Sequence, residues 1–359
     1  MERRSFIKKA SVGAAAGTIA APALAQSQPT LNWRLASSFP KSLDTIFGAA
    51  ETFSQRVSQL TNGKFNVRVF AGGEIVPALQ VMDAVQAGTV EMGHTASYYY
   101  FGKDPTFAFD CAVPFGLNSR QQTAWINQGG GMQLMREFFK DYGIVNFLGG
   151  NTGCQMGGWF RKEVKSVQDL NGLKMRIGGF AGRVMQRLGL VPQQIAGGDI
   201  YPALEKGTID AAEWVGPYDD EKLGFFKVAP HYYAPGWWEA GPQLSFYVGI
   251  KEWEKLPKDY QAAVEAASAE AHIVMQAEYD AKNPAALARL LKNGVKLHNF
   301  SREIMDACYK AATEVMEEEA SKNAKFKKVY EPWKRFRQDQ NQWASVAEAP
   351  LQNYMITRR

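Results

Sequence analysis

One short motif occurs twice in this sequence. Residues Ala71–Leu79 read AGGEIVPAL and, 125 positions later, Ala196–Leu204 read AGGDIYPAL. Each copy leads into a short apolar stretch, a glycine and an acidic strand start, in Ala84–Met92 and Ala203–Ala211. The glycine supplies the left-handed residue that ends a helix. Six fewer residues separate motif and glycine in the second copy, which predicts a shorter helix there. We therefore expect two equivalent half-structures that meet face to face and form a cleft.

The first 25 residues have the character of an export signal. Arg3 and Arg4 precede an Ala/Gly-rich stretch, and a small-x-small cleavage site follows at Ala23–Ala25. The arginine pair indicates the twin-arginine route, and the apolar stretch is too short to span a bilayer. We expect the mature protein to be soluble and periplasmic.

Because the segment 1–25 carries four basic residues and one acidic residue, its removal lowers the net charge from +5 to +2. Neither nucleic acid nor an anionic membrane surface is indicated as a partner.

The mature chain alternates between strand and helix patterns. Thr30–Ala36 and Lys64–Phe70 have the alternating apolar residues of half-buried strands, and Leu43–Leu60 between them has helical spacing. Two strands and a helix joined by short turns predict a right-handed βαβ unit in a mostly parallel sheet. Further strands are expected at 89–94, 144–149, 159–161, 172–177 and 211–215, and helices on both sides of 129–131, at 181–188, 259–279, 284–292 and 302–321, and from about 332.

Two crossings between lobes are expected. The glycine-rich run Gly149–Gly158 marks the first crossing, and Ala234–Tyr247 begins with turn residues and continues as a strand that returns. A chain of 359 residues is long enough for two cores. The predicted fold is therefore α/β, with two lobes around a hinge cleft. The expected divisions are 1–25 for the signal, 26–149 with 242–283 for lobe 1, 150–241 with 284–330 for lobe 2, and 331–359 for a C-terminal helix.

Several common chemistries are not indicated. The four histidines have no metal-ligand spacing to one another or to cysteine, which argues against a zinc site. The sequence has no G-x-S-x-G elbow, no Walker lysine loop and no dinucleotide-binding glycine fingerprint. The three cysteines, Cys111, Cys154 and Cys308, are an odd number for an oxidising compartment. We interpret them as buried small hydrophobic residues, with one disulfide as the alternative.

Polar groups of the second lobe fall at expected strand ends, where open α/β sheets bind ligands. Arg176 ends a strand-like run and can present a planar fork to a carboxylate; a surface salt bridge is the alternative. Gln155, Glu213 and the Trp214 carbonyl offer hard oxygen atoms suited to Na⁺ or Ca²⁺, although a turn hydrogen bond or a solvated strand end would also explain the side chains. Asn151 can donate its amide to a ligand oxygen or form a turn.

Together these residues resemble the solute-binding proteins of tripartite ATP-independent periplasmic (TRAP) transporters, most closely the branch that binds 2-oxo acids. The resemblance covers nearly all of the mature chain. Its most specific stretches are Gly149–Lys162, Leu173–Gly179, Gly197–Trp214 and Pro235–Pro242. It implies a two-lobed α/β fold with a connecting helix across both lobes, which closes on its ligand like a hinged trap.

The resemblance also implies roles for particular residues. Arg176 would bind the ligand carboxylate, while Gln155, Glu213 and the Trp214 carbonyl would hold the cation bound with it. In the first lobe, the aromatic run that follows the equivalent strand matches the wall of the cleft. Tyr98 and Tyr100 are the predicted ligand contacts, together with Gln155, Asn151 and Glu213 from the second lobe.

The last predicted helix carries Trp333, Phe336 and Trp343 with basic residues between them. Such a pattern can bind single-stranded nucleic acid, but amphipathic packing on a lobe or on a partner subunit is commoner. Because both lobes are complete before this helix, a single subunit offers its rings no obvious core. Members of the resembled branch exchange this helix between subunits, which implies a homodimer through Pro332–Tyr354.

The expected function is that of a periplasmic receptor. It would capture a small 2-oxo monocarboxylate such as pyruvate with Na⁺ or Ca²⁺ and deliver it to the TRAP membrane permease, without covalent chemistry. A 2-hydroxy acid such as lactate presents the same carboxylate and a neighbouring oxygen, and is the second hypothesis. A periplasmic cation-assisted lyase with Glu213 as its base is the rival from another class, against which we count the absence of a second acid or base near that residue.

Overall fold

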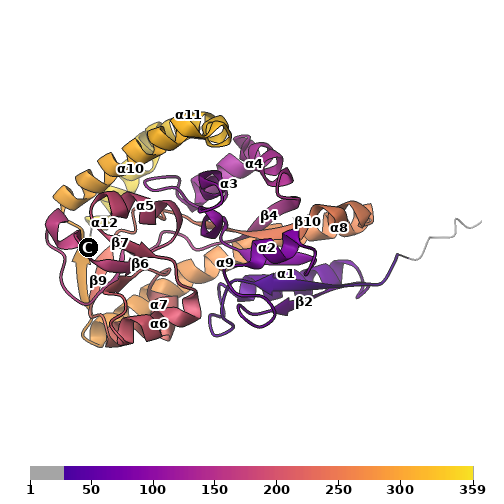
Figure 1. Ribbon diagram of the computed structural model, residues 1–359, viewed down its shortest axis with the longest axis horizontal. Coiled ribbons are helices and arrows are strands. Elements are labelled where there is room, and N and C mark those ends of the chain that lie inside the picture. The colour runs from indigo at the N-terminus through magenta and orange to yellow at the C-terminus, as the bar shows by residue number, and fades with distance from the viewer. Residues whose placement is uncertain (1–27, 359) are drawn as a thin grey trace, which may run out of the picture. The chain divides into compact units, whose positions relative to one another are not determined.

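The predicted βαβ unit opens the fold of the computed structural model (Figure 1). Strands β1 (Leu31–Ser37) and β2 (Phe65–Phe70) pair in parallel, and α1 (Gly48–Leu60) connects them. Phe53 and Val57 of α1 are fully buried, as the helical spacing predicts. The helix begins later than expected, because the apolar residues before Gly48 are buried in successive turns rather than in a helix.

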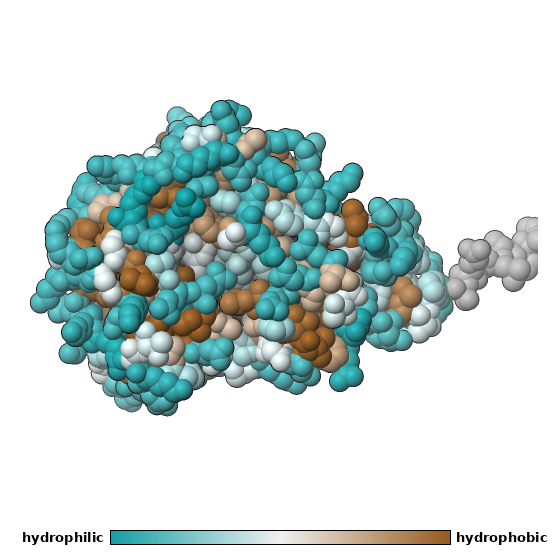
Figure 2. All heavy atoms as spheres, in the orientation of Figure 1, coloured by the Kyte–Doolittle hydropathy of each residue, from teal (hydrophilic) through white to brown (hydrophobic). Residues whose placement is uncertain are grey.

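The structure describes residues 28–358, and the chain from Leu31 onward forms one unit. The predicted signal segment, 1–25, lies outside the described residues. No helix in the described range combines the length and the hydrophobicity needed to cross a membrane. The face shown in Figure 2 is mainly hydrophilic, with apolar residues grouped in small patches.

The described residues form two sheets. Sheet A has the order β2, β1, β3 (Met92–Thr95), β10 (Gln243–Gly249) and β4 (Ile144–Asn151). Sheet B has the order β11 (Lys296–Asn299), β9 (His231–Ala234), β5 (Gly158–Phe160), β8 (Ala211–Ala212), β6 (Lys174–Arg176) and β7 (Val191–Gln193). In sheet A, β10 runs antiparallel to both of its neighbours, and in sheet B, β5 does the same. The other pairings are parallel.

Helices cover both sheets. The helices are α2 (Val81–Gln86), α3 (Ser119–Gln128), α4 (Gly131–Lys140), α5 (Gly179–Arg187), α6 (Gly197–Glu205), α7 (Pro217–Leu223), α8 (Ile250–Lys255), α9 (Lys258–Lys292), α10 (Arg302–Lys322), α11 (Ala324–Ala347) and α12 (Ala349–Ile356), with 3₁₀ helices η1 (Ser97–Tyr100), η2 (Pro105–Asp110), η3 (Val167–Leu170) and η4 (Phe225–Lys227). We call sheet A with α1–α4 the sheet A module, and sheet B with α5–α7 the sheet B module.

Within residues 28–358, the chain passes three times between the sheets: after β4, after β9, and along α9. Helix α9 has 35 residues and packs on α1, β4 and α7, so it contacts both modules (Figure 1). The expectation of separate helices at 259–279 and 284–292 is wrong, because Pro284 lies inside this continuous helix. Packing along both modules outweighs the backbone hydrogen bond that the proline removes.

The two copies of the repeated motif end alike but begin differently. Each copy ends its helix at a left-handed glycine, Gly88 with φ of 70° and Gly207 with φ of 72°. After each glycine, the next two amides donate to one carbonyl of the last helical turn, at the equivalent position. The expected shorter helix of the second copy is wrong, since α6 has 9 residues and α2 has 6. The motif itself is helical in the second copy, whereas it forms turns in the first.

The C-terminal helices lie over both modules. Helix α10 packs on α5, and α11 packs on α3 and α4 (Figure 1). Trp333 is 1% exposed and packs edge-on against Phe109, and Phe336 contacts the same core next to Gly129. The expectation that the rings of this helix lack a core in one subunit is therefore wrong for Trp333 and Phe336, whereas Trp343 is exposed. The helix also starts at Ala324 rather than near Pro332, and Lys328 pairs with Glu137 of α4 before the predicted start.

All three cysteines are unpaired. Cys111 and Cys308 are buried, as expected of small hydrophobic residues. Cys154 is exposed, contrary to expectation, because it lies in the loop that crosses from β4 to β5.

Candidate ligand-binding site

Arg176 ends β6, and its guanidinium is buried at 1% exposure. Its Nε donates to the Ile195 carbonyl at 3.2 Å, and its Nη1 donates to the Glu213 carbonyl at 2.8 Å and forms an ion pair with the Glu213 carboxylate. Its Nη2 has no hydrogen-bond partner. The surface salt bridge considered for Arg176 is thus a buried pair. Because a buried unpaired N–H is costly, Nη2 marks a position for an acceptor.

Glu213 and Trp214 directly follow β8. Glu213 is fully buried, and its Oε2 has no partner, whereas Oε1 holds Arg176. The Trp214 ring lies 5.0 Å from the Arg176 guanidinium carbon, in a cation–π contact. The segment after β8 therefore holds the guanidinium from two sides.

Gln155 and Glu239 come from the two loops that cross between the sheets. The Gln155 amide donates to the Glu239 carbonyl at 3.1 Å, which ties the loops together. The side-chain nitrogen of Gln155 donates to the Thr152 hydroxyl at 3.1 Å. Gln155 Oε1 and Glu239 Oε2 are both buried without a partner. Glu239 lies close enough to Arg176 and Glu213 for their charges to interact, and Gln155 lines the same cavity as Trp214.

The buried charges are unbalanced, since two carboxyl groups share one guanidinium. Burial raises the pKa of Glu213, and Arg176 offsets only part of this. Burial and then the charge of Glu213 raise the pKa of Glu239 well above its ordinary value. Burial by itself would lower the pKa of Arg176, but Glu213, Tyr99, Tyr98 and Glu239 together outweigh burial and raise that pKa. A cation placed here would favour the ionised form of both carboxyl groups.

The aromatic side of the site consists of Tyr98 and Tyr99, whose rings meet edge to face at 5.1 Å. Tyr98 and Glu239 lie close enough for each to shift the pKa of the other. Tyr100, predicted as a ligand contact, instead bonds to the Met82 amide and the Thr95 hydroxyl, both at 3.0 Å, inside the sheet A module. A 3₁₀ helix turns about 120° per residue, so three successive tyrosines cannot all face one cavity.

Asn151, the last residue of β4, is fully buried and uses its whole amide within the crossing. Its Nδ2 donates to the Gly241 carbonyl at 3.0 Å, and its Oδ1 accepts from the Gly153 amide at 2.9 Å. The structure therefore places Asn151 as a link between the two crossing loops, in line with its turn-forming alternative.

A small cavity of about 10 Å³, roughly the space of one water molecule, lies next to these groups. Tyr98, Tyr99, Gln155 and Trp214 contribute to its wall. A larger groove of about 820 Å³ lies between residues 72–80 and 194–199, so the repeated motifs do face each other. None of the described residues along that groove has a buried polar atom without a partner. Of the residues with unpartnered atoms, Gln155 lines the small cavity, and Arg176 adjoins it through its contact with the Trp214 ring.

Sequence reasoning missed Glu239 and Tyr99. Glu239 is the acidic residue of a Gly- and Pro-rich crossing. A carboxylate in such an apolar turn was the sequence feature that could have indicated a site residue. Nothing local distinguishes Tyr99 from its neighbours.

In the described range, no group of three His, Cys, Asp or Glu side chains could hold a metal ion. A cation here would need Gln155 Oε1, the Trp214 carbonyl and oxygen atoms of the ligand beside Glu213.

Sequence comparisons point to one family. Residues 36–323 match the sequence model of the family described as bacterial extracellular solute-binding protein, family 7. The chain is 51% identical over 360 residues to a monocarboxylate 2-oxoacid-binding periplasmic protein of Nostoc sp. strain PCC 7120, covering 99% of both chains.

Solved structures of TRAP solute-binding proteins are similar. One from Bordetella bronchiseptica RB50, a mixed-occupancy dimer with copurified calcium and picolinate, has a TM-score of 0.91 and 56% identity, covering 92% of this chain and 98% of that one. One from Pseudoalteromonas atlantica T6c with bound sodium and pyruvate has a TM-score of 0.88 and 38% identity, covering 92% and 100%. One from Colwellia psychrerythraea with bound calcium and pyruvate has a TM-score of 0.87 and 39% identity, covering 90% and 99%. The chain therefore belongs to bacterial extracellular solute-binding protein family 7, the solute-binding proteins of TRAP transporters.

Proposed function

We propose that this protein is a periplasmic receptor that binds a small 2-oxo monocarboxylate, such as pyruvate, together with Na⁺ or Ca²⁺ and delivers it to a TRAP permease. One observation carries the proposal. Arg176 Nη2 lacks an acceptor, while Glu213 Oε2, Glu239 Oε2 and Gln155 Oε1 lack a donor or cation. An anion alone would pair with Arg176 Nη2 but would leave the three oxygen atoms unpaired. A cation alone would bind the oxygen atoms but would leave Nη2 without an acceptor. A carboxylate that arrives with its cation satisfies both.

Each group then has a distinct role. Arg176 Nη2 would donate to the ligand carboxylate, and Tyr98 would limit the cavity on the side of the sheet A module. Glu213, Gln155 and the Trp214 carbonyl would hold the cation, whose remaining positions would take ligand oxygen atoms, including the 2-oxo group. The cation supplies the positive charge that the buried carboxyl groups lack. The 2-oxoacid-binding Nostoc relative and the two pyruvate-bound structures support this ligand class.

Ligand exchange requires the lobes to separate, because the cavity has room for about one water molecule. We place the lobes at 26–149 with 242–283 and at 150–241 with 284–330. The three chain crossings would act as the hinge between them.

Export and assembly complete the proposal. The twin arginines before residue 25 would direct the chain to the twin-arginine route. The end of α11 and all of α12 would join two subunits, since their apolar side chains are exposed and the B. bronchiseptica structure is a dimer. These exposed residues are Trp343, Val346, Leu351, Tyr354, Met355 and Ile356.

A lyase remains the rival from another class. Contrary to the expectation that Glu213 has no second acid or base near it, Glu239 lies close enough for the two charges to interact. Incubation with pyruvate and calcium, followed by product analysis, separates the two functions. We expect unchanged pyruvate and no new product, whereas turnover would favour the lyase.

Calorimetric titration tests the receptor directly. Pyruvate and lactate are titrated into the protein with sodium, with calcium, and in chelated sodium-free buffer. We expect pyruvate binding that needs a cation and is tighter than lactate binding. Equal pyruvate affinity with and without cations would contradict the cation site, and tighter lactate binding would move the assignment to 2-hydroxy acids.

A further inference from the structure

Helix α7 directly follows the segment that carries Trp214, and its inward face holds that residue. Asp219 of α7 is fully buried and accepts hydrogen bonds from the Trp214 indole nitrogen at 3.4 Å and from the Tyr279 hydroxyl of α9 at 2.7 Å. The Trp214 ring in turn stacks on the Arg176 guanidinium. A displacement of α7 therefore shifts the groups that face the ligand.

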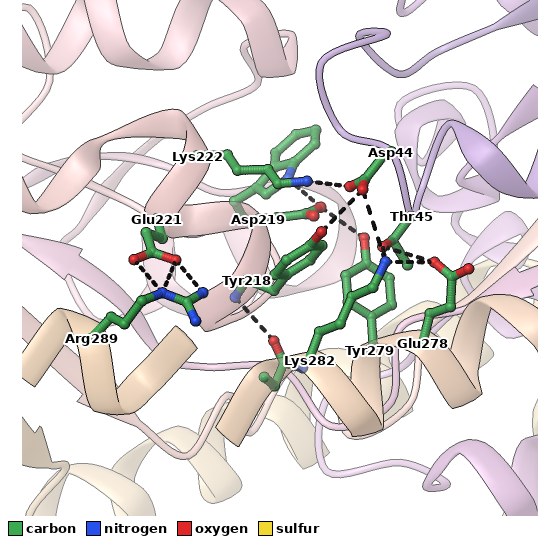
Figure 3. Close-up of polar contacts among 12 residues, drawn as sticks. Asp44, Thr45, Tyr218, Asp219, Glu221, Lys222, Glu278, Tyr279, Lys282 and Arg289 are labelled. Carbon is green, nitrogen blue, oxygen red and sulfur yellow. Dashed lines mark hydrogen bonds and ion pairs between the residues drawn. The ribbon is translucent and has the colours of Figure 1, made fainter. Parts of the chain in front are cut away.

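The outward face of α7 reaches the other module (Figure 3). The Tyr218 hydroxyl donates to Asp44 Oδ2 at 3.0 Å, and Lys222 forms an ion pair with Asp44 Oδ1. Asp44 lies between β1 and α1, in the sheet A module. Nζ of Lys282, on α9, lies 3.8 Å from Asp44. The ammonium groups of Lys222 and Lys282 lie 4.0 and 4.8 Å from the centre of the Tyr218 ring. The Asp44 carboxylate therefore contacts side chains of both α7 and α9.

The electrostatics of Asp44 agree with this geometry. Partial burial raises its pKa, but the hydrogen bonds from Lys222 and Tyr218 and the charges of Lys222 and Lys282 together outweigh burial and bring the pKa below its ordinary value. The carboxylate is therefore held in its charged form by groups of α7 and α9.

We propose that Asp44, Tyr218 and Lys222 form a latch that stabilises the closed cleft, and that Asp219 is a positioning residue through which α7 couples the latch to Trp214. The inference rests on the proposed function. When the modules separate, Asp44 leaves α7 and the latch contacts are lost. A partly exposed ion pair of this kind shifts an open–closed equilibrium by about two- to fivefold. Apparent affinity falls by the same factor, because only the closed form binds fully.

The first test is Asp44→Asn, with Glu221→Gln as the matched control. Glu221 lies on α7, beside Tyr218 and Lys222, and carries the same charge as Asp44, but it pairs with Arg289 of α9 at 2.6 Å (Figure 3). With pyruvate and calcium as probes, we expect Asp44→Asn to weaken both affinities by about two- to fivefold and to speed pyruvate release. Glu221→Gln should match the wild type. The latch proposal is overturned if Asp44→Asn binds pyruvate and calcium as tightly as the wild type. It is also overturned if Glu221→Gln loses as much affinity as Asp44→Asn.

Amide hydrogen exchange on the ligand-free protein tests the latch independently of the proposed function. We expect Asp44→Asn to speed amide exchange at residues 213–215 by about two- to fivefold, and Glu221→Gln to leave it unchanged. If the wild type bound no pyruvate with any cation, the proposed function would fall, yet exchange would still decide the latch. Equal protection in the wild type and Asp44→Asn would reject it.

Discussion

Replacing Arg176 by lysine separates the charge of this residue from its shape. The buried guanidinium already uses Nε and Nη1 on Ile195 and Glu213, so Nη2 is the donor left for a ligand. Lysine keeps a positive charge beside Glu213 but has no planar fork to reach all of these positions. The expected loss is one hydrogen bond to a charged acceptor, about 1.5–3 kcal/mol, or about 10- to 150-fold in Kd.

Calorimetric titration of pyruvate at saturating calcium measures this loss, while circular dichroism and thermal unfolding verify the fold. Arg183→Lys is the matched control, because Arg183 pairs with Glu319 at 2.7 Å on the outside of α5 and is 42% exposed. We expect the control to bind within about twofold of the wild type. Alanine at Arg176 is a poorer choice, since it leaves Glu213 buried without a counter-charge and costs about 3–5 kcal/mol of folding stability.

The reasoning is refuted if folded Arg176→Lys binds pyruvate within about threefold of the wild type. That outcome would mean that the guanidinium serves only to neutralise Glu213, and that the ligand carboxylate binds elsewhere.

Four further measurements test other parts of the structure. Glu239→Gln removes one buried negative charge, so it should weaken pyruvate binding more at low calcium than at saturating calcium; an equal loss at both would argue against a shared cation. Burial raises the pKa of Asp219 to about 7. Because the folded pKa exceeds the unfolded one, this group adds stability at low pH that is lost as pH rises from about 4 through about 7, and Asp219→Asn should flatten that decline in urea unfolding. A thiol reagent should modify Cys154 in the folded protein and the two buried cysteines only after denaturation; three fast thiols would contradict the burial. Deleting 342–359 should convert a dimer to a monomer in light scattering without loss of pyruvate affinity, whereas a persistent dimer would place the interface elsewhere.

Local sequence patterns account for much of the fold. The alternation around Leu31–Ser37 and the helical stripe with Phe53 and Val57 predict the first βαβ unit, because burial of one face selects the period of each element. The left-handed glycines Gly88 and Gly207 were predictable for the same reason, since few other residues adopt that conformation at a helix end.

Part of the site was also predictable. Arg176, Glu213 and Trp214 stand at strand ends, and Gln155 stands in a glycine-rich crossing, so their chemistry and their place along the chain suggested a shared ligand. The structure brings these four residues together in one cavity region with unpartnered polar atoms.

The remaining features depend on contacts between distant segments. The same motif forms turns at 71–79 and a helix at 197–205, and Pro284 lies inside a helix, because the surrounding elements offer different surfaces to each. Trp333 enters the core since α11 docks on α3 and α4.

By itself, the sequence determined the α/β units, their helix ends and the donors and acceptors of the site, all of which follow from residue chemistry and from neighbours along the chain. Only the tertiary structure decided that Tyr99 rather than Tyr100 meets the cavity, that Glu239 faces Glu213, and that Asp44 reaches α7. The physical reason is that burial, charge imbalance and an ion pair across the modules exist only once distant segments are packed together.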